Sequence, residues 1–157
     1  MTSSKVDPQQ FAELATSARE RWSNFGNWER IYFPSLVGVQ IEELRVDYCR
    51  MRLPFRAELE QPMGVVHGGA IATLIDVCVV PAIGAAYESV VNYSTVDLHV
   101  QYHRALIQED AVCHGWVTKR GRSVIFCEAE VIGASSDKVI AHGFMTYNVS
   151  PQRVRDS

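Results

Sequence analysis

The chain contains 157 residues, of which 47% are hydrophobic and 21% are charged, and its net charge is −3 at pH 7. This length suits one domain with a sizeable core, and the composition excludes a disordered chain. A pI near 5.9 without a basic stripe argues against a nucleic-acid partner.

The first predicted element is an amphipathic helix over residues 7–23. Asp7-Pro8 is a helix start signal, because aspartate caps free N–H groups and proline suits the first helical position. Apolar side chains then recur at helical spacing as far as Trp22. The N-terminal stretch lacks the apolar core of a signal peptide, and the cysteines are scattered singly rather than in pairs (Cys49, Cys78, Cys113, Cys127). We therefore expect reduced, buried thiols in a cytoplasmic protein.

A loop rich in aromatic residues follows, with Phe25, Trp28, Tyr32 and Phe33. These side chains either line a pocket or cap the core, and capping is the simpler interpretation. Residues 36–44 and 45–56 then alternate between apolar and polar side chains, which predicts two strands.

Residues 68–86 form the predicted central helix. Their side chains are small or aliphatic on every side, which is typical of a helix enclosed by other structure. The apolar stretch from Val65 to Tyr87 is long enough to suggest a membrane span, but it contains Asp76 and Pro81 near its middle. We predict no membrane contact, and we expect Pro81 to bend or interrupt the last turn.

The hydrophobic period changes from 3.6 to 2 after this helix. From Thr95 to His103, apolar residues hold every even position and polar residues every odd one, which predicts a strand with one buried face. Further strands are predicted at 111–120, 123–132 and 138–149. The sum is an α+β domain in which a curved antiparallel sheet wraps around a central helix, with an extra N-terminal helix.

Two features of the central helix carry candidate chemistry. At its start, His67-Gly68-Gly69 would present free backbone N–H groups at the positive end of the helix dipole. An oxygen that becomes negative during a reaction could be held by Gly68, Gly69 or both, although a tight turn alone would also need glycine. Further along, burying the ionised carboxylate of Asp76 costs free energy unless polar groups compensate its charge. We therefore expect this carboxylate either to have a function or to bind a backbone amide or an arginine.

The spacing of these features favours a dimer. Gly68 and Asp76 are eight residues apart, which is roughly 12 Å along a helix axis. A reacting carbon has to lie about 3 Å from both the nucleophile and the oxyanion donors, so one helix cannot supply both. Two antiparallel helices across a two-fold axis could supply both, which predicts a homodimer with two shared sites.

One combination of motifs resembles the hotdog-fold acyl-CoA thioesterases of the PaaI-like group. It consists of Gln61-x-x-Gly64-x-x-His67-Gly68-Gly69, Asp76, Thr95-Val96-Asp97-Leu98 with Tyr102, the Gly121-Arg122 hairpin and the closing strand 140–146. The resemblance implies a hotdog domain over residues 35–149. An N-terminal helix and aromatic loop (1–34) would precede this domain, and a C-terminal tail (150–157) would follow it.

The resemblance also implies catalytic roles. Asp76 would act as general base or nucleophile on the thioester, the N–H of Gly68 would bind the thioester carbonyl, and His67 would orient the site or touch the leaving sulfur. Gln61 stands where the family usually has asparagine, so the amide is retained with a different reach.

Two further groups of residues follow from the same resemblance. A hydroxyl at the start of the next strand, Thr95 or its neighbour Ser94, would place the water. Basic side chains would contact the phosphates of CoA, and the candidates are Arg104, Arg120 and Arg122. We expect no cofactor and no metal, because a thiolate is a good leaving group and needs neither.

The implied activity is hydrolysis of small, medium-chain or aryl acyl-CoA by a homodimer that assembles further into a homotetramer. Two alternatives stay open: an acyl-thioester hydratase or dehydratase of the same fold, and a non-catalytic acyl-CoA-binding protein. A metal site at His99, His103 and His114 is less favoured than solvent-facing or inter-subunit histidines. A serine hydrolase is disfavoured because no GxSxG elbow is present.

Overall fold

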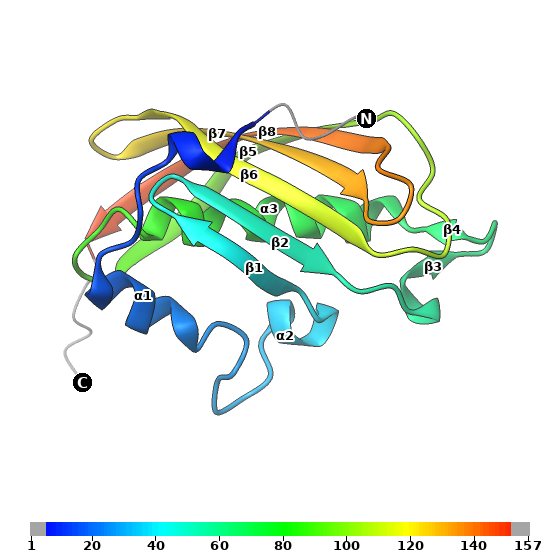
Figure 1. The fold of residues 1–157 in the computed structure, drawn as a ribbon, viewed down its shortest axis with the longest axis horizontal. Helices are drawn as coiled ribbons and strands as arrows, with labels where there is room; N and C mark the ends of the chain where they lie inside the picture. The colour runs from blue at the N-terminus through cyan, green and yellow to red at the C-terminus, as the bar shows by residue number, and fades with distance from the viewer. Residues whose placement is uncertain (1–5, 152–157) are drawn as a thin grey trace.

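The structure, a computed structural model, describes residues 6–151. Six antiparallel strands form one curved sheet in the order β1-β2-β6-β7-β8-β5, and the long helix α3 (Gly68–Gly84) packs across its inner face (Figure 1). The strands are β1 (Gln40–Arg45), β2 (Tyr48–Leu53), β5 (Val91–Tyr102), β6 (Ala111–Arg120), β7 (Val124–Gly133) and β8 (Val139–Pro151). The predicted α+β architecture, an antiparallel sheet around a central helix, is confirmed.

Helix α3 begins where the sequence predicts and ends two residues earlier. His67 is its N-cap, and Nδ1 of this histidine accepts a hydrogen bond from the N–H of Gly69 at 2.8 Å. Pro81 lies in the last turn, and the helix continues through it to Gly84. Because proline has no N–H, one intrahelical bond is missing near that end of the helix.

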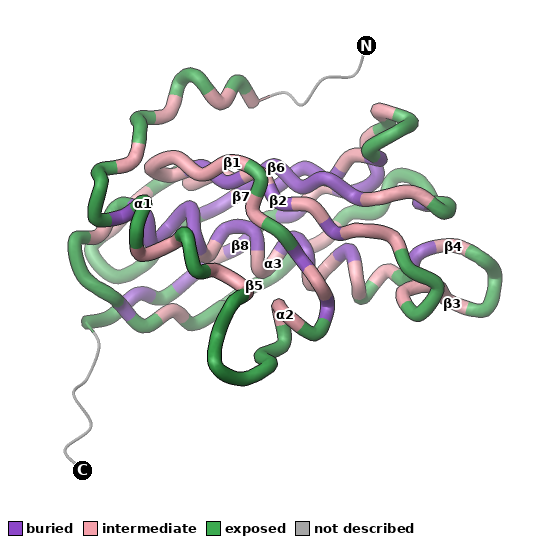
Figure 2. The backbone as a smooth tube through the Cα atoms, turned by 60° about the horizontal axis from the view of Figure 1, so that its bottom comes forward, coloured by how far each residue is buried: buried purple, intermediate pink, exposed green. Residues whose placement is uncertain are grey.

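One face of α3 forms the centre of the core. Its fully buried side chains, which pack against β2, β6 and β7, are Leu74, Ile75, Cys78 and Val79. Figure 2 shows buried residues gathered along α3 and the strands beside it. A second stripe at helical spacing is only half-buried, and it comprises Thr73, Asp76, Val77 and Val80. The expectation that α3 is enclosed on every side is therefore not met within one chain, because the sheet curves around only part of the helix.

The predicted helix over residues 7–23 is interrupted. Asp7 caps only a short 3-10 turn, η1 (Pro8–Gln10), and the α-helix α1 (Thr16–Ser23) begins after a gap. Between them, the chain extends and the ring of Phe11 stacks on Tyr48 of β2, with 5.2 Å between ring centroids. The extended segment lets the Phe11 ring pack against the sheet, whereas a continuous helix would leave this ring exposed, so burial of the ring favours the extended conformation.

Helix α1 is anchored to the end of α3. The guanidinium of Arg21 donates to the carbonyl oxygens of Gly84 (3.4 Å), Tyr87 (2.6 Å) and Glu88 (3.0 Å). Carbonyls at a helix C-terminus lack intrahelical partners, and a cation there also interacts favourably with the helix dipole. The N-terminal segment is therefore fixed against the domain.

Short elements separate the larger ones. The aromatic loop leads into helix α2 (Phe33–Val37), so the first predicted strand starts only at β1. The sequence did not indicate the turn η2 (Ala57–Leu59) or the hairpin of β3 (Glu60–Gln61) and β4 (Val65–Val66). Two-residue strands are too short to show alternation. The later strand predictions are confirmed as β5 to β8.

Strand β5 lies at one end of the sheet and pairs only with β8 among the described strands. The apolar side of β5 faces the same side of the sheet as α3, yet Leu98 and Tyr102 remain 38% and 52% exposed. Val96 lies in the register shift between Thr95 and Asp97 and is 65% exposed. The predicted burial of this face is therefore not met within one chain.

Among residues 6–151, no helix combines the length and apolar character that would let it cross a membrane. The first five residues, and residues 152–157 of the expected C-terminal tail, lie outside the described residues.

Gly143 of β8 marks a close approach between the sheet and α3. A Cβ added at this position would collide with Cγ2 of Ile75, whose side chain is fully buried. We expect Gly143→Ala to lower the free energy of unfolding by about 1–3 kcal/mol through overpacking, seen as a lower urea midpoint. Ser150→Ala, an exposed change on the same strand, is the control. Equal urea midpoints for Gly143→Ala and Ser150→Ala would contradict the interpretation that Gly143 packs too closely on Ile75 to accept a larger residue.

Candidate active site

The carboxylate of Asp76 is held by two hydroxyl groups. Its Oδ1 accepts hydrogen bonds from Oγ1 of Thr95 at 3.0 Å and from Oη of Tyr147 at 2.5 Å, and the same Oη lies 2.7 Å from the carbonyl oxygen of Asp76. In the hydrogen bonds of residues 6–151, Oδ2 of Asp76 is not engaged, and no salt bridge there includes this residue. The charge is compensated by hydroxyl donors rather than by an arginine, and one carboxylate oxygen is left for a ligand or water.

Tyr147 is a site residue that the sequence analysis missed. Its side chain is almost fully buried, and this burial raises its pKa above the ordinary value, with the adjacent Asp76 carboxylate raising it further. The hydroxyl therefore stays protonated at neutral pH and can donate. Strand alternation marks Tyr147 as inward-facing, but its partner depends on the pairing of distant strands.

The pairing of β5 with β8 separates Thr95 from Ser94. Thr95 lies opposite Tyr147 and faces α3, whereas Ser94 lies opposite Asn148. Successive side chains of a strand point to opposite faces, so Ser94 is directed away from the carboxylate. A register shift between Thr95 and Asp97 follows directly after the site.

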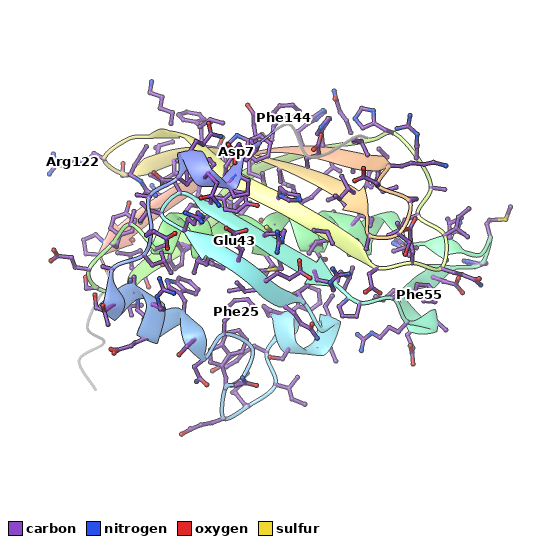
Figure 3. All side chains as sticks on the ribbon, in the orientation of Figure 1. Asp7, Phe25, Glu43, Phe55, Arg122 and Phe144 are labelled. Atoms are coloured by element: carbon purple, nitrogen blue, oxygen red, sulfur yellow. The ribbon has the colours of Figure 1, made fainter. Side chains whose placement is uncertain are left out.

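A cavity of about 340 Å³ opens beside Asp76. Its walls come from the N-terminal segment, α3, β5 and β8, and the lining residues are Trp22, Phe25, Trp28, Pro34, Asp76, Val77, Val80, Tyr93, Thr95 and Tyr147. Figure 3 shows Phe25 in the segment between α1 and α2. Phe25 and Trp28 of the aromatic loop therefore line a pocket, whereas Tyr32 and Phe33 are exposed and are not among its lining residues.

The start of α3 distinguishes the two glycines. The N–H of Gly69 is occupied by Nδ1 of His67, so this nitrogen acts as an acceptor and the neutral ring carries its proton on Nε2. No hydrogen bond within residues 6–151 takes the N–H of Gly68, while its carbonyl accepts from Oη of Tyr102 at 2.7 Å. Gly68 is thus the better placed donor for an incoming oxygen.

A second cavity, of about 360 Å³, lies at this helix start. Gly68, Tyr102 and Arg104 line it, and the Arg104 guanidinium donates to the carbonyl of Val139 at 3.0 Å. Asp76 is not among its lining residues, and Gly68 is not among those of the cavity beside Asp76. Within one chain, the carboxylate and the free amide do not converge.

The other two candidate arginines lie away from both cavities. Arg120 forms an ion pair with Asp47, donates to the carbonyl of Ile83 at 3.1 Å and lies over the ring of Tyr87 at 5.1 Å. Its hydrogen bonds and ion pair use Nη2, while Nε and Nη1 are buried without a hydrogen-bond partner among the described residues. Because these nitrogens are buried, we do not retain Arg120 as a phosphate ligand. Arg122 is exposed in the β6–β7 hairpin, at the end of the molecule opposite β3 and β4 (Figure 3).

Gln61 lies in the tight β3–β4 hairpin before the helix. Its carbonyl accepts from the N–H of Gly64 at 2.9 Å, and its side-chain Oε1 accepts from the N–H of Met63 at 2.8 Å. Gly64 has a φ of 77°, which glycine adopts readily in such a turn. The Gln61 amide therefore stabilises its own turn, with its NH₂ group left as a donor.

The histidines outside the helix start do not form a metal centre. His114 is buried, at 8% exposure, and its Nδ1 lies 2.8 Å from the hydroxyl of Tyr48, so the solvent-facing expectation is wrong for this residue. His99 and His103 are exposed. In the described part of the chain, no cluster of three or more potential ligands could hold a metal ion.

Comparison of this chain with known proteins identifies its family. Residues 63–140 match the model of the thioesterase superfamily. The Halobacterium salinarum protein VNG_1336C, whose name describes an esterase, is 33% identical over 103 residues, which cover 62% of this chain and 68% of that protein. The chain belongs to the thioesterase superfamily. This membership supports hydrolysis of an acyl thioester as its general activity.

Solved structures of lower identity share the fold of this thioesterase. The thioesterase HI1161 of Haemophilus influenzae gives a TM-score of 0.79 at 16% identity, over 94% of this chain and 99% of that one. The PaaI protein of Escherichia coli, from its phenylacetic acid degradation operon, gives a TM-score of 0.73 at 13% identity over 85% and 95% of the two chains. The resemblance to PaaI-like hotdog thioesterases is thus confirmed.

Proposed function

We propose that this thioesterase hydrolyses acyl-CoA thioesters, with the carboxylate of Asp76 either attacking the thioester carbon or activating water. One observation carries the proposal: Asp76 is held by Thr95 and Tyr147 through a single oxygen, at the wall of an aromatic-lined cavity. A non-catalytic binder has no need for a carboxylate in this position.

We propose that the working unit is a homodimer formed along β5. Its outer edge lacks a partner among the described strands, and Leu98 and Tyr102 leave apolar surface uncovered. An edge strand of this length with an exposed apolar face favours pairing with another strand. Antiparallel pairing of two copies would also bring the two α3 helices side by side.

The mechanism follows from this arrangement. Asp76 of one subunit takes a proton from water as the water oxygen bonds to the thioester carbon, or attacks that carbon itself. The carbonyl oxygen becomes negative and is held by the N–H of the partner subunit's Gly68. In the general-base route, collapse of the tetrahedral intermediate breaks the carbon–sulfur bond, and the proton taken up by Asp76 passes to the leaving sulfur, so CoA departs as the thiol. In the nucleophilic route, the same bond breaks and leaves a mixed anhydride on Asp76. Water then adds to the anhydride, one proton of that water goes to the thiolate, and the acid leaves with the carboxylate of Asp76 restored.

The binding of CoA is assigned to the region around the start of α3. Arg104 borders the cavity there, together with Gly68, and a guanidinium suits phosphate oxygens. Exposed Arg122 is kept as a second candidate. The four free, buried cysteines fit a reducing compartment, so we propose a cytoplasmic location for the homodimer and its homotetramer.

The direct test is a panel of acyl-CoA esters assayed by release of free thiol. We expect turnover of at least one class among short, medium-chain and aryl acyl groups. Binding of the esters without any thiol release would support the acyl-CoA-binding alternative. Addition of water to an unsaturated acyl-CoA, without thiol release, would support a hydratase.

The hydroxyls of Thr95 and Ser94 allow a test of which one supports Asp76. Thr95→Val removes the hydroxyl that donates to Asp76, and hydrogen bonds to charged groups contribute about 1.5–3 kcal/mol, so we expect roughly a tenfold or larger loss of kcat. Thr95→Ser retains the donor and should preserve most of the rate. Ser94→Ala is the matched control, because Ser94 points to the opposite face. A larger loss with Ser94→Ala than with Thr95→Val would reverse the assignment.

A further inference from the structure

Two cavities meet at the same pair of aromatic side chains. A cavity of about 550 Å³ lies between the N-terminal segment and β1, with Leu14, Val39 and Leu44 in its walls. The cavity beside Asp76 also has both of these residues in its lining. Trp22 and Phe25 are the residues common to the two linings, and we take this pair as the partition between the two spaces.

Trp22 is the fixed member of this partition. It belongs to α1, which Arg21 anchors to the end of α3. Its ring packs so closely on Gly84 that a Cβ added there would collide with Cζ2 of the indole. A change at Trp22 would therefore disturb the attachment of α1 as well as the partition.

Phe25 is the separable member. It follows α1 in a turn, where its N–H donates to the carbonyl of Trp22 at 3.1 Å. Its half-buried ring lies 6.2 Å from the ring of Trp22, in a tilted arrangement, and 5.2 Å from that of Trp28, edge to face. Loss of this ring would join the two cavities without removing a backbone contact.

We infer that Phe25, backed by Trp22, ends the acyl pocket and sets the upper length of the acyl group. This inference rests on the proposed function and names its substrate class: a compact apolar acyl group, such as a single ring or a short branched chain. An apolar cavity of about 150 Å³ accommodates benzene, so the 340 Å³ beside Asp76 holds a ring with its linker. A long linear chain would have to pass the partition.

The test compares Phe25→Ala with Phe33→Ala. Phe33 is exposed in α2 and lines neither cavity, so this control makes the same chemical change in the same segment. We measure kcat/KM for dodecanoyl-CoA relative to benzoyl-CoA. Phe25→Ala should raise this ratio by about tenfold or more, because a single methylene in an apolar pocket is already worth about that factor. Phe33→Ala should leave the ratio unchanged.

A second variant acts in the opposite direction and keeps the partition intact. Phe25→Trp enlarges the ring, and it should lower kcat/KM for the longest acyl group that the wild-type protein accepts while benzoyl-CoA turnover is retained. The inference is overturned if neither Phe25 variant moves the length preference, or if Phe33→Ala moves it as much.

Binding of S-dodecyl-CoA and S-benzyl-CoA, thioethers that cannot be hydrolysed, separates this inference from the proposed function. If no ester is cleaved but Phe25→Ala shifts relative affinity toward the dodecyl thioether, the pocket boundary stands and the thioesterase proposal fails. If esters are cleaved but neither rate nor affinity ratios shift, the proposed function stands and the boundary at Phe25 is wrong.

Discussion

Replacing Asp76 by asparagine is expected to reduce kcat for thiol release by roughly 10²- to 10⁴-fold, the range for loss of a positioned acid–base group. The amide keeps the size of the side chain and can still accept from Thr95 and Tyr147. The fold should therefore be retained, and KM should change much less than kcat. Steady-state kinetics on the best ester of the panel measure both effects.

The matched control for this substitution is Asp97→Asn. Asp97 is an exposed carboxylate on the same strand as Thr95, but it lies opposite Thr146 on the other face of the sheet. The same loss of charge at this position should leave kcat near the wild-type value. Comparable rates for Asp76→Asn and the wild type would remove Asp76 from the mechanism.

Leu98→Arg is expected to convert the proposed homodimer into monomers and to remove most thiol release. Leu98 lies opposite Met145 on the inner side of β5, where the second copy would cover it. An uncompensated charge buried at such a contact costs about 3–5 kcal/mol, so the dissociation constant should rise by roughly a hundredfold or more. Sedimentation measured over a concentration series reports the assembly, and the ester assay reports activity at the same concentrations.

Gln101→Arg introduces the same side chain on the opposite face of the same strand. Gln101 is exposed and lies opposite His142. It should leave the dimer and its activity in place. A Leu98→Arg protein that is monomeric and fully active would show that one subunit carries a complete site.

The elements that could be predicted from the sequence are those with local signals. The β6 strand was predicted at its observed bounds because Arg120-Gly121-Arg122 has the composition of the hairpin that ends it. Helix α3 was predicted from its apolar run and the glycines at its start. The split of the helix over residues 7–23 could not be predicted, because the ring of Phe11 leaves the helical path to stack on Tyr48, a contact between distant segments.

The site residues divide in the same way, into those with local sequence signals and those placed by contacts between distant segments. Asp76 and Thr95 could be proposed from their own sequence contexts, and the structure brings their side chains together. Tyr147 could not, since its approach to Asp76 depends on the β5–β8 register. The aromatic loop was open between two interpretations because only its position against α3 decides whether Trp28 lines a cavity. Arg120 was a phosphate candidate because of its charge, but its ion pair with Asp47 joins distant parts of the chain and could not be predicted from the sequence.

The three carbonyl contacts of Arg21 couple helix stability to substrate choice. A shortened chain starting at residue 35 would keep every strand and α3, yet it would lose both the cation at the helix terminus and the aromatic partition. Such a chain should melt at a lower temperature and, where it still folds, accept acyl groups with little regard to their length. Trimming the protein to its sheet-and-helix body would thus erase selectivity while leaving the carboxylate and its two hydroxyl partners intact.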